Sequence, residues 1–278
     1  MIFLLYLLIV IFGTAIGSFL GVIVDRLGSR EPIWKGRSHC DHCRHILQPL
    51  DLIPIVSFFV LGAKCRYCHK KLSWFYPLIE FCTGFSYLAA AITVFSAAGY
   101  FTLQLPYLLL LLYYMILSGT LLVIFFADVR YGIIPFKAVI VALLTTIVWY
   151  LTVPLLSFSA YNIELLGLQF SFLSIIGSAV GAGGFFFLLF ILTKGRGMGF
   201  GDVVYAFLMG FVLGFPRVCL GLYIAFVLGA VISLGLVALK KKHLKGGTIP
   251  FGPFLVFGTI VSLFYGNTLI HLFIRYFT

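Results

Sequence analysis

Eight long apolar runs fill most of this 278-residue sequence, and they constrain its fold more than any other feature. A helix needs about 20 consecutive apolar residues to cross the hydrocarbon core of a bilayer. Seven runs reach that length and the sixth does not; they cover residues 1–24, 76–98, 105–127, 133–153, 170–193, 203–215, 219–239 and 251–274. The runs predict an all-α membrane protein, a polytopic bundle of about eight transmembrane helices, with the sixth broken or half exposed.

The positive charges alternate between the connections of these runs. Of the 19 Lys and Arg residues, 17 lie in four connections, at 25–75, 128–137, 194–201 and 240–249. The connections between them, 99–104 and 154–169, carry none. Positively charged loops stay in the cytoplasm, so both termini are expected outside. The net charge of +11 is thereby explained by topology, and no motif supports nucleic-acid binding. Arg217 and Arg275 are the two exceptions.

The first run is expected to be a true span, because no Lys or Arg precedes it, no small-residue cleavage site follows it, and it is too long for a signal peptide. Its glycines recur every fourth residue, at Gly13, Gly17 and Gly21. Such a ridge suits close helix packing, although a plain apolar helix is equally compatible. We expect three parts: a first transmembrane helix, a cytoplasmic loop domain and a transmembrane bundle, at residues 1–25, 26–75 and 76–278.

The loop of residues 26–75, called the four-Cys loop below, holds two Cys-x2-Cys pairs with 21 residues between them: Cys40 with Cys43, and Cys65 with Cys68. Four thiolates in this pattern can close a tetrahedral zinc shell. A reducing cytoplasm disfavours disulfides, but unliganded thiols or an iron–sulfur site stay open. A closed shell leaves no position for water, so the zinc is predicted to be structural. The flanking histidines, any of which could replace a cysteine, are expected at the surface: His39, His42, His45 and His69.

Two of the eight acidic residues stand at the ends of apolar runs. Asp128 ends the third run in "FFADVRYGIIP", and Asp202 opens the sixth in "GFGDVVY". Both fall at the cytoplasmic margin of the predicted bundle. A charged carboxylate at the bilayer centre costs roughly 2.5–3.5 kcal/mol, so such residues persist mainly where they have a partner or a task. Each one alone is better explained as an ordinary interfacial charge.

Together, the two carboxylates suggest acid–base chemistry. Neighbouring carboxylates share one proton, so the ionised one can take a proton from water while the protonated one donates to a scissile carbonyl. That is peptide hydrolysis without a metal. The alternating glycines before Asp202, at 197, 199 and 201, would let an extended substrate backbone approach it, or else form a flexible loop. The apolar stretch 52–62 is too short to span and is expected to fold back onto the bundle or lie at the membrane surface.

Several stretches, in order, resemble the bacterial type IV prepilin leader peptidase/N-methyltransferase family, membrane aspartic proteases with a Gly-x-Gly-Asp motif. They are "GSFLGVIVDRL", "CDHC", "DLIPIVSFFVLGAKCRYC", "LSWFYPLIE", "DVRYGIIP", "GMGFGD" and "IPFGPF". The resemblance implies that Asp128 and Asp202 are the catalytic pair. It also implies cleavage of a short basic leader after a glycine, with prepilin and pseudopilin precursors as partners, at the cytoplasmic face of the bacterial cytoplasmic (inner) membrane.

Many members of that family also methylate the new amino terminus with S-adenosylmethionine. The resemblance therefore implies S-adenosylmethionine as a possible cofactor. The family usually carries Asn where this chain has Gly21, and an aromatic and basic pair where it has Asp25 and Arg26. Glu80 matches a family position. It is expected either to pair with loop arginines or to serve the helix end.

Two other functions fit parts of the pattern. A presenilin-like intramembrane protease shares Gly-x-Gly-Asp but would cut within a transmembrane helix, and the four-Cys loop speaks against it. A proton-coupled transporter with a zinc-bound loop would use intramembrane carboxylates as relays. Those relays usually lie near the midplane, whereas Asp128 and Asp202 are expected at the boundary. A cut mapped within the transmembrane helix of a precursor would indicate the presenilin-like protease. Proton-coupled uptake into liposomes, without peptidase activity, would indicate the transporter.

Overall fold

A computed structural model describes residues 2–29, 32, 36–98, 104–155, 172–239 and 250–277. Eight apolar helices correspond to the eight predicted runs: α1 (Ile2–Ser29), α3 (Phe75–Ala98), α4 (Leu105–Tyr131), α5 (Phe136–Thr152), α7 (Phe172–Leu192), α8 (Phe200–Leu213), α9 (Arg217–Ala238) and α10 (Gly252–Phe277). Seven are long and apolar enough to cross a membrane, and α8 is shorter. Within the described residues there is no β-strand beyond two isolated bridges. The predicted polytopic α-helical membrane protein is confirmed.

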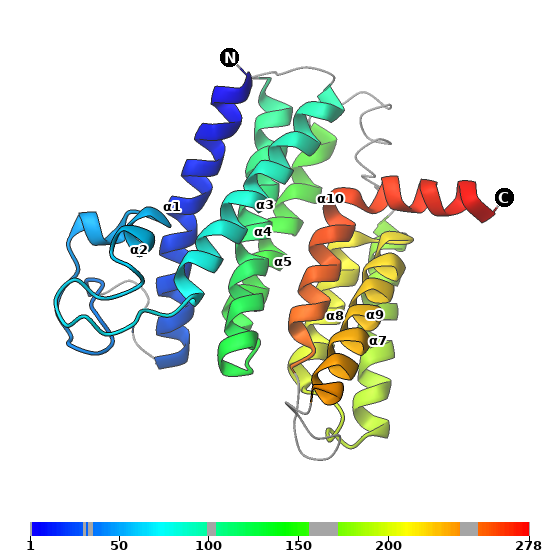
Figure 1. Cartoon of the computed structure of the whole chain (residues 1–278). Coiled ribbons are helices and arrows are strands. Elements are labelled where there is room, and N and C mark those ends of the chain that lie inside the picture. The colour runs from blue at the N-terminus through cyan, green and yellow to red at the C-terminus, as the bar shows by residue number, and fades with distance from the viewer. Residues whose placement is uncertain are drawn as a thin grey trace.

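The helices form two neighbouring groups (Figure 1). The N-terminal group holds α1, α3, α4 and α5, and the C-terminal group holds α7, α8, α9 and α10. Helix α10 packs on both α9 and α4 and so joins the groups, while its red C-terminal part turns across the direction of the others. The short elements are the 3-10 turns η1 (Pro49–Leu52) and η2 (Val153–Leu155) and the helix α2 (Val56–Val60).

The glycine ridge of α1 brings that helix against α3. A Cβ at Gly13 would lie 2.8 Å from the Cα of Gly84, and one at Gly17 would lie 2.7 Å from the Cα of Glu80. Real Cβ atoms do not approach backbone so closely, so only glycine allows this separation. The prediction of close helix packing is confirmed, and Glu80 is held against α1 as a result.

The stretch around residues 52–62 folds back onto α3, which is one of the two arrangements expected for it. Phe58 is buried and its ring lies 5.0 Å from that of Trp74, centroid to centroid. The backbone N–H of Ile55 donates to a carboxylate oxygen of Glu80 at 2.6 Å. The expected pairing of Glu80 with loop arginines is not seen among the described residues. The four-Cys loop is therefore tied to α3 beside the membrane-spanning helices. The proposed boundaries at residues 25 and 75 stay predictions.

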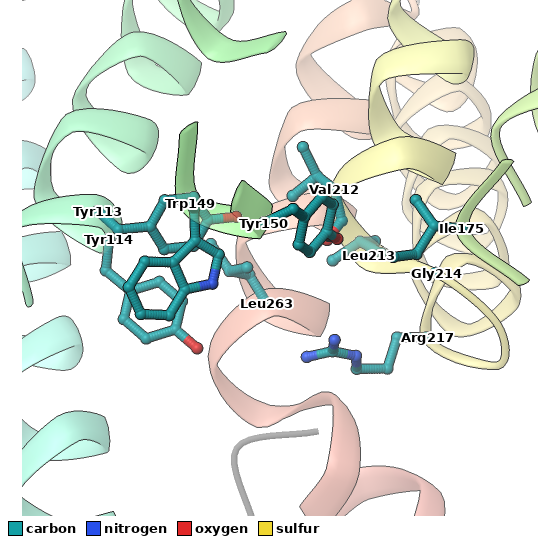
Figure 2. Close-up of a pocket in the computed structure, with 10 residues that line it drawn as sticks. All are labelled: Tyr113, Tyr114, Trp149, Tyr150, Ile175, Val212, Leu213, Gly214, Arg217 and Leu263. Carbon is teal, nitrogen blue, oxygen red and sulfur yellow. Dashed lines mark hydrogen bonds between the residues drawn. The ribbon is translucent and has the colours of Figure 1, made fainter. Parts of the chain in front are cut away.

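Helix α8 is too short to cross the hydrocarbon core of a bilayer. Its 14 residues extend about 21 Å, whereas the hydrocarbon core is about 30 Å thick. Arg217, which opens α9 just beyond, is 9% exposed, and Figure 2 shows its guanidinium directed toward a cavity beside Tyr114 and Leu263. That cavity of about 20 Å³ has room for about one water molecule. Arg217 thus lies within the protein rather than in a loop, which explains why it departs from the charge pattern.

Candidate active site and candidate metal centre

Asp128 lies in the last turn of α4. The helix ends there because Gly132 adopts a left-handed conformation (φ 64°), and its N–H donates to the Asp128 carbonyl at 2.9 Å. The Asp128 side chain is buried, and its Oδ2 atom has no hydrogen-bond partner among the described residues. A buried oxygen without a donor is costly, so this atom is available to a water or a substrate.

Asp202 lies in the first turn of α8, where its side chain has a structural partner. Its Oδ2 accepts the N–H of Gly199, the residue that caps the helix, at 3.2 Å. A carboxylate at this third position commonly reaches back to the cap. The positive end of the helix dipole also favours negative charge here. Asp202 is buried like Asp128, so both predicted carboxylates are shielded from solvent.

The helix ends that carry these two residues converge at one end of the bundle. A Cβ placed at Gly252, the first residue of α10, would collide with Oδ2 of Asp128 and lie 3.3 Å from Cδ1 of Ile134. A Cβ at Gly201 would lie 3.1 Å from Cβ of the same isoleucine. The ends of α4, α8 and α10 therefore meet around Ile134.

The glycines near Asp202 differ in their surroundings. A Cβ at Gly201 would press on Ile134, and one at Gly197 would lie 3.0 Å from Thr193, so both glycines serve packing. Only Gly199 has open space beside the carboxylate, with Asp202 Oδ2 at 3.8 Å from a built Cβ. Sequence reasoning missed Gly252 and Ile134 as site residues. Both nevertheless lie inside the quoted stretches "IPFGPF" and "DVRYGIIP".

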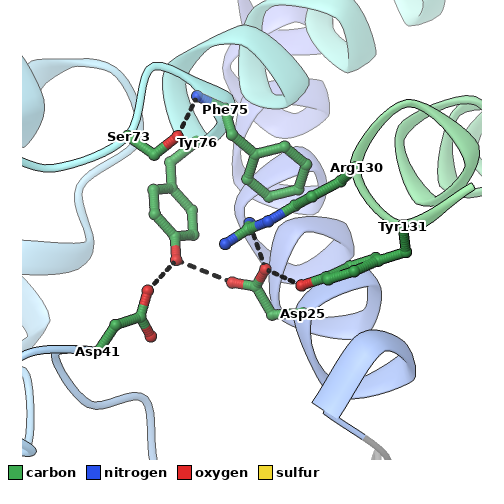
Figure 3. Close-up of polar contacts among 7 residues, drawn as sticks. All are labelled: Asp25, Asp41, Ser73, Phe75, Tyr76, Arg130 and Tyr131. Atoms are coloured by element: carbon green, nitrogen blue, oxygen red, sulfur yellow. Dashed lines mark hydrogen bonds and ion pairs between the residues drawn. The ribbon is translucent and has the colours of Figure 1, made fainter. Parts of the chain in front are cut away.

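A polar cluster ties the end of α4 to α1 and α3 (Figure 3). Asp25 pairs with Arg130 and accepts hydrogen bonds from the hydroxyls of Tyr76 at 2.8 Å and Tyr131 at 3.3 Å. The Arg130 guanidinium also lies over the ring of Phe75, 4.5 Å from its centroid. Because Arg130 follows Asp128 by two residues, it faces the opposite side of the helix. Nothing in the sequence marks this pairing, except that Arg130 lies two residues after the Asp128 of the aspartate motif.

The four cysteines of the loop come together, as their spacing predicts. The Sγ atoms of Cys40, Cys43, Cys65 and Cys68 all lie within 4.8 Å of one another. The Sγ atoms of Cys40 and Cys68 are 3.9 Å apart, close to the edge of about 3.8 Å that a tetrahedral zinc–sulfur shell has. The donor set and its size therefore fit one zinc ion.

Each cysteine pair lies in its own backbone turn, and the two turns have the same conformation. The N–H of Arg44 donates to the Cys40 carbonyl at 2.9 Å, and that of His69 donates to the Cys65 carbonyl at 3.0 Å. Both donors have positive φ, 57° and 55°. Burial raises the pKa of the Cys65 thiol, but the backbone N–H groups of Cys68 and Tyr67 outweigh it and bring the pKa down to about 7. The N–H of Lys70 lowers the pKa of Cys68, but burial and hydrogen bonds with the other three thiols outweigh it and raise that pKa to about 11.

The histidines stand apart from the sulfur cluster. None joins it within the residues that the structure describes. His42, His45 and His69 are exposed, as expected. His39 is half-buried, and its Nε2 lies 2.7 Å from a guanidinium nitrogen of Arg44.

Known proteins match the chain along nearly its full length. The bacterial peptidase A24 N-terminal domain matches residues 11–94, which include all four cysteines. The type IV leader peptidase family matches residues 115–234, which include both aspartates. No solved structure matches.

Three relatives illustrate the similarity, each named prepilin leader peptidase/N-methyltransferase. The Bacillus subtilis (strain 168) protein is 30% identical over 95% of this chain and 96% of its own length. The Aeromonas hydrophila protein is 28% identical over 94% of this chain and 91% of its own length. The Pseudomonas aeruginosa protein is 27% identical over 96% of this chain and 92% of its own length. With these matches, and with both motif aspartates at one end of a helical membrane bundle, this chain belongs to the type IV leader peptidase family.

Proposed function

We propose that the chain is an aspartic endopeptidase that removes the short basic leader of type IV prepilins and pseudopilins. The observation that supports the proposal is that the buried residues Asp128 and Asp202, from different helices, both lie where the ends of α4, α8 and α10 converge around Ile134. The names of the relatives give independent support.

The two aspartates take different parts in the reaction. Asp202, at the positive end of α8, is the ionised partner and takes a proton from a water molecule. Asp128, whose Oδ2 has no other partner in the described part of the chain, is protonated and donates to the scissile carbonyl oxygen. The water oxygen attacks the carbonyl carbon as Asp202 takes the water proton. When the carbon–nitrogen bond breaks, the departing amine takes that proton from Asp202, and the former carbonyl oxygen returns its proton to Asp128.

The site is placed at the cytoplasmic face of the bacterial cytoplasmic membrane, with both chain termini outside. The charge pattern supports this orientation, since 17 of the 19 basic residues belong to the connections on that side. A leader's own Lys and Arg would remain there, while the apolar helix of the precursor lies in the bilayer.

Substitution of each aspartate tests the proposal. Asp128→Asn and Asp202→Asn should each lower prepilin cleavage by at least about 100-fold, because each removes one proton-transferring group. Normal processing by either active-site variant would refute the assignment. A cut within the apolar helix of the precursor would favour an intramembrane protease.

We further propose that Cys40, Cys43, Cys65 and Cys68 bind a structural zinc ion, and that S-adenosylmethionine serves a second activity, methylation of the new amino terminus. When bound, S-adenosylmethionine supplies an electrophilic methyl group on a positively charged sulfur. The sulfur cluster and the relatives' names support these assignments. Incubation with a prepilin, with and without the methyl donor, followed by mass measurement of the product, tests the second activity.

A further inference from the structure

The helices of the C-terminal group end at a common level on the side away from Asp128 and Asp202. The cavity in Figure 2 is lined by Ile175, Gly214 and Arg217. These residues lie within three residues of the start of α7, the end of α8 and the start of α9. By the orientation proposed above, this level is the outer end of the group.

Helix α10 reaches the same level and is held there by Arg217. The hydroxyl of Ser262 donates to the Arg217 carbonyl at 2.7 Å. A Cβ at Gly266 would lie 3.1 Å from Cγ and Cδ of the Arg217 side chain. Residues 267–276, called the α10 tail below, follow this contact without a break in the helix. This red C-terminal part turns across the direction of the spanning helices and leaves the bundle (Figure 1).

The part of α10 that precedes the tail is too short to cross a bilayer. From Gly252, beside Asp128, to Gly266 it extends about 21 Å at 1.5 Å per residue. The hydrocarbon core is about 30 Å thick, so a straight α10 would need about six more residues to cross it. Those residues belong to the tail, which runs along the plane of the membrane because it turns across the spanning direction.

The sequence of the tail, "NTLIHLFIRY", is amphipathic. Its polar residues Asn267, His271 and Arg275 recur every fourth position and therefore lie on one face of the helix. Nearly all other positions hold Leu, Ile, Phe or Tyr, and the side chains of Phe273 and Tyr276 are 65% and 84% exposed. A broad apolar face beside a basic polar face is typical of helices that lie in the interface of a bilayer.

Lipid is the partner that the position of the tail supplies. Because the tail leaves the bundle short of the full hydrocarbon thickness, its apolar face borders acyl chains. Lipid phosphates match the charge of Arg275, whose side chain is long enough to extend toward them. A bilayer accommodates a short span by thinning locally, at a modest cost per Å.

We propose that the α10 tail is an interfacial helix that binds the lipid surface of the outer leaflet. Its apolar face, around Phe273, lies in the acyl chains, and its polar face, with His271 and Arg275, meets the lipid phosphates. Helix α10 then ends its crossing at Gly266, and the outer leaflet is drawn inward over the C-terminal group. The choice of leaflet rests on the orientation proposed above, whereas the flat placement of the tail does not.

Cysteine substitution along the tail of the full-length protein tests this placement. The background carries Cys82→Ser and Cys219→Ser, and a membrane-impermeant maleimide is added to right-side-out vesicles, where the four-Cys loop is out of reach. A maleimide reacts with the thiolate, which forms in water and not in hydrocarbon. The four scanned side chains are exposed or half-buried, so cysteine should be tolerated at each: Leu269, His271, Phe273 and Arg275.

A flat tail predicts that labelling follows the helix face. His271→Cys and Arg275→Cys should react at least about tenfold faster than Leu269→Cys and Phe273→Cys, with the labelled peptide identified by mass spectrometry. A straight spanning helix predicts instead that reactivity rises steadily toward the C-terminus, with Phe273→Cys faster than His271→Cys. That result would overturn the proposal.

Two further variants test which partner covers each face. Arg275→Glu should raise the labelling of Phe273→Cys severalfold, because its charge is repelled by lipid phosphates, and unchanged labelling would overturn the phosphate contact. Lys137→Glu is the matched control, since Lys137 is an exposed basic residue at the other end of the bundle. Oxidation of Phe273→Cys to a disulfide-linked dimer in high yield would show a second copy of the chain, rather than lipid, on the apolar face.

Inside-out vesicles separate this inference from the proposed orientation. With both termini outside, His271→Cys should react in right-side-out vesicles and be protected in inside-out ones. The opposite result would overturn the assignment to the outer leaflet, while the contrast between His271→Cys and Phe273→Cys would still decide whether the tail lies flat.

Discussion

Gly252→Ala tests the position of Asp128 with a single methyl group. A Cβ at this position would collide with Oδ2 of Asp128 and lie 3.1 Å from its Cγ, whereas ordinary contact begins at 3.4 Å. The backbone needs no change, since Gly252 is not among the glycines with positive φ. The substitution therefore displaces the carboxylate and leaves α10 intact.

The expected effect follows from that displacement. A misplacement of about 1 Å can lower an enzymatic rate about 100-fold, which corresponds to about 2.7 kcal/mol in the activation barrier. The assay is the initial rate of leader removal from a purified prepilin, with enzyme in nanodiscs and the product quantified by mass spectrometry. Thermal stability should stay equal to that of the unaltered protein.

Gly181→Ala is the matched control, because a Cβ at Gly181 meets nothing within 4 Å. It should leave both rate and stability unchanged. If Gly252→Ala cleaved within about twofold of the normal rate, a change of less than about 0.5 kcal/mol in the barrier, the carboxylate would not occupy this position in the competent enzyme. The proposed dyad geometry would then be wrong.

Three further predictions concern the surrounding framework. Cys65→Ser should reduce bound metal below the expected value of about one zinc per chain, measured by elemental analysis, because it removes one of four thiolates. Gly17→Ala should lower the free energy of unfolding by about 1–3 kcal/mol, measured by denaturation in mild detergent, because its methyl group would push on the α3 backbone at Glu80. Asp25→Asn should lower the stability by about 1 kcal/mol through loss of its ion pair with Arg130, and should also slow leader cleavage by loosening the end of α4.

Controls for these changes come from elsewhere in the chain. Cys219 lies outside the sulfur cluster, so Cys219→Ser should retain the metal. Equal metal content in Cys65→Ser and the unaltered protein would contradict the four-thiolate site. Full stability of Gly17→Ala would show that α1 and α3 separate more easily than their contact suggests. Unchanged cleavage by Asp25→Asn would mean that its cluster does not position Asp128.

The sequence alone determined the transmembrane architecture and the composition of both candidate centres. In a bilayer, the backbone N–H and C=O groups of an apolar run must be hydrogen-bonded within the protein, and a helix does this. The eight runs therefore predicted eight helices, including the short sixth one. The cysteine pairs were predictable because each pair shares one tight turn. Asp128 and Asp202 could be identified as candidates because a carboxylate at the edge of an apolar segment is costly without a partner or a task.

Only the tertiary structure decided which side chains meet. Gly252 contacts Asp128, and Asp25 pairs with Arg130, across helices far apart in the chain. Those contacts depend on the angles and depths at which the helices pack, and no local pattern encodes them. The common level at which α9 and α10 meet arises in the same way, from the contact of Gly266 with Arg217. Periodicity and spacing fix each segment by itself, whereas distances between segments come from the packing of all of them together.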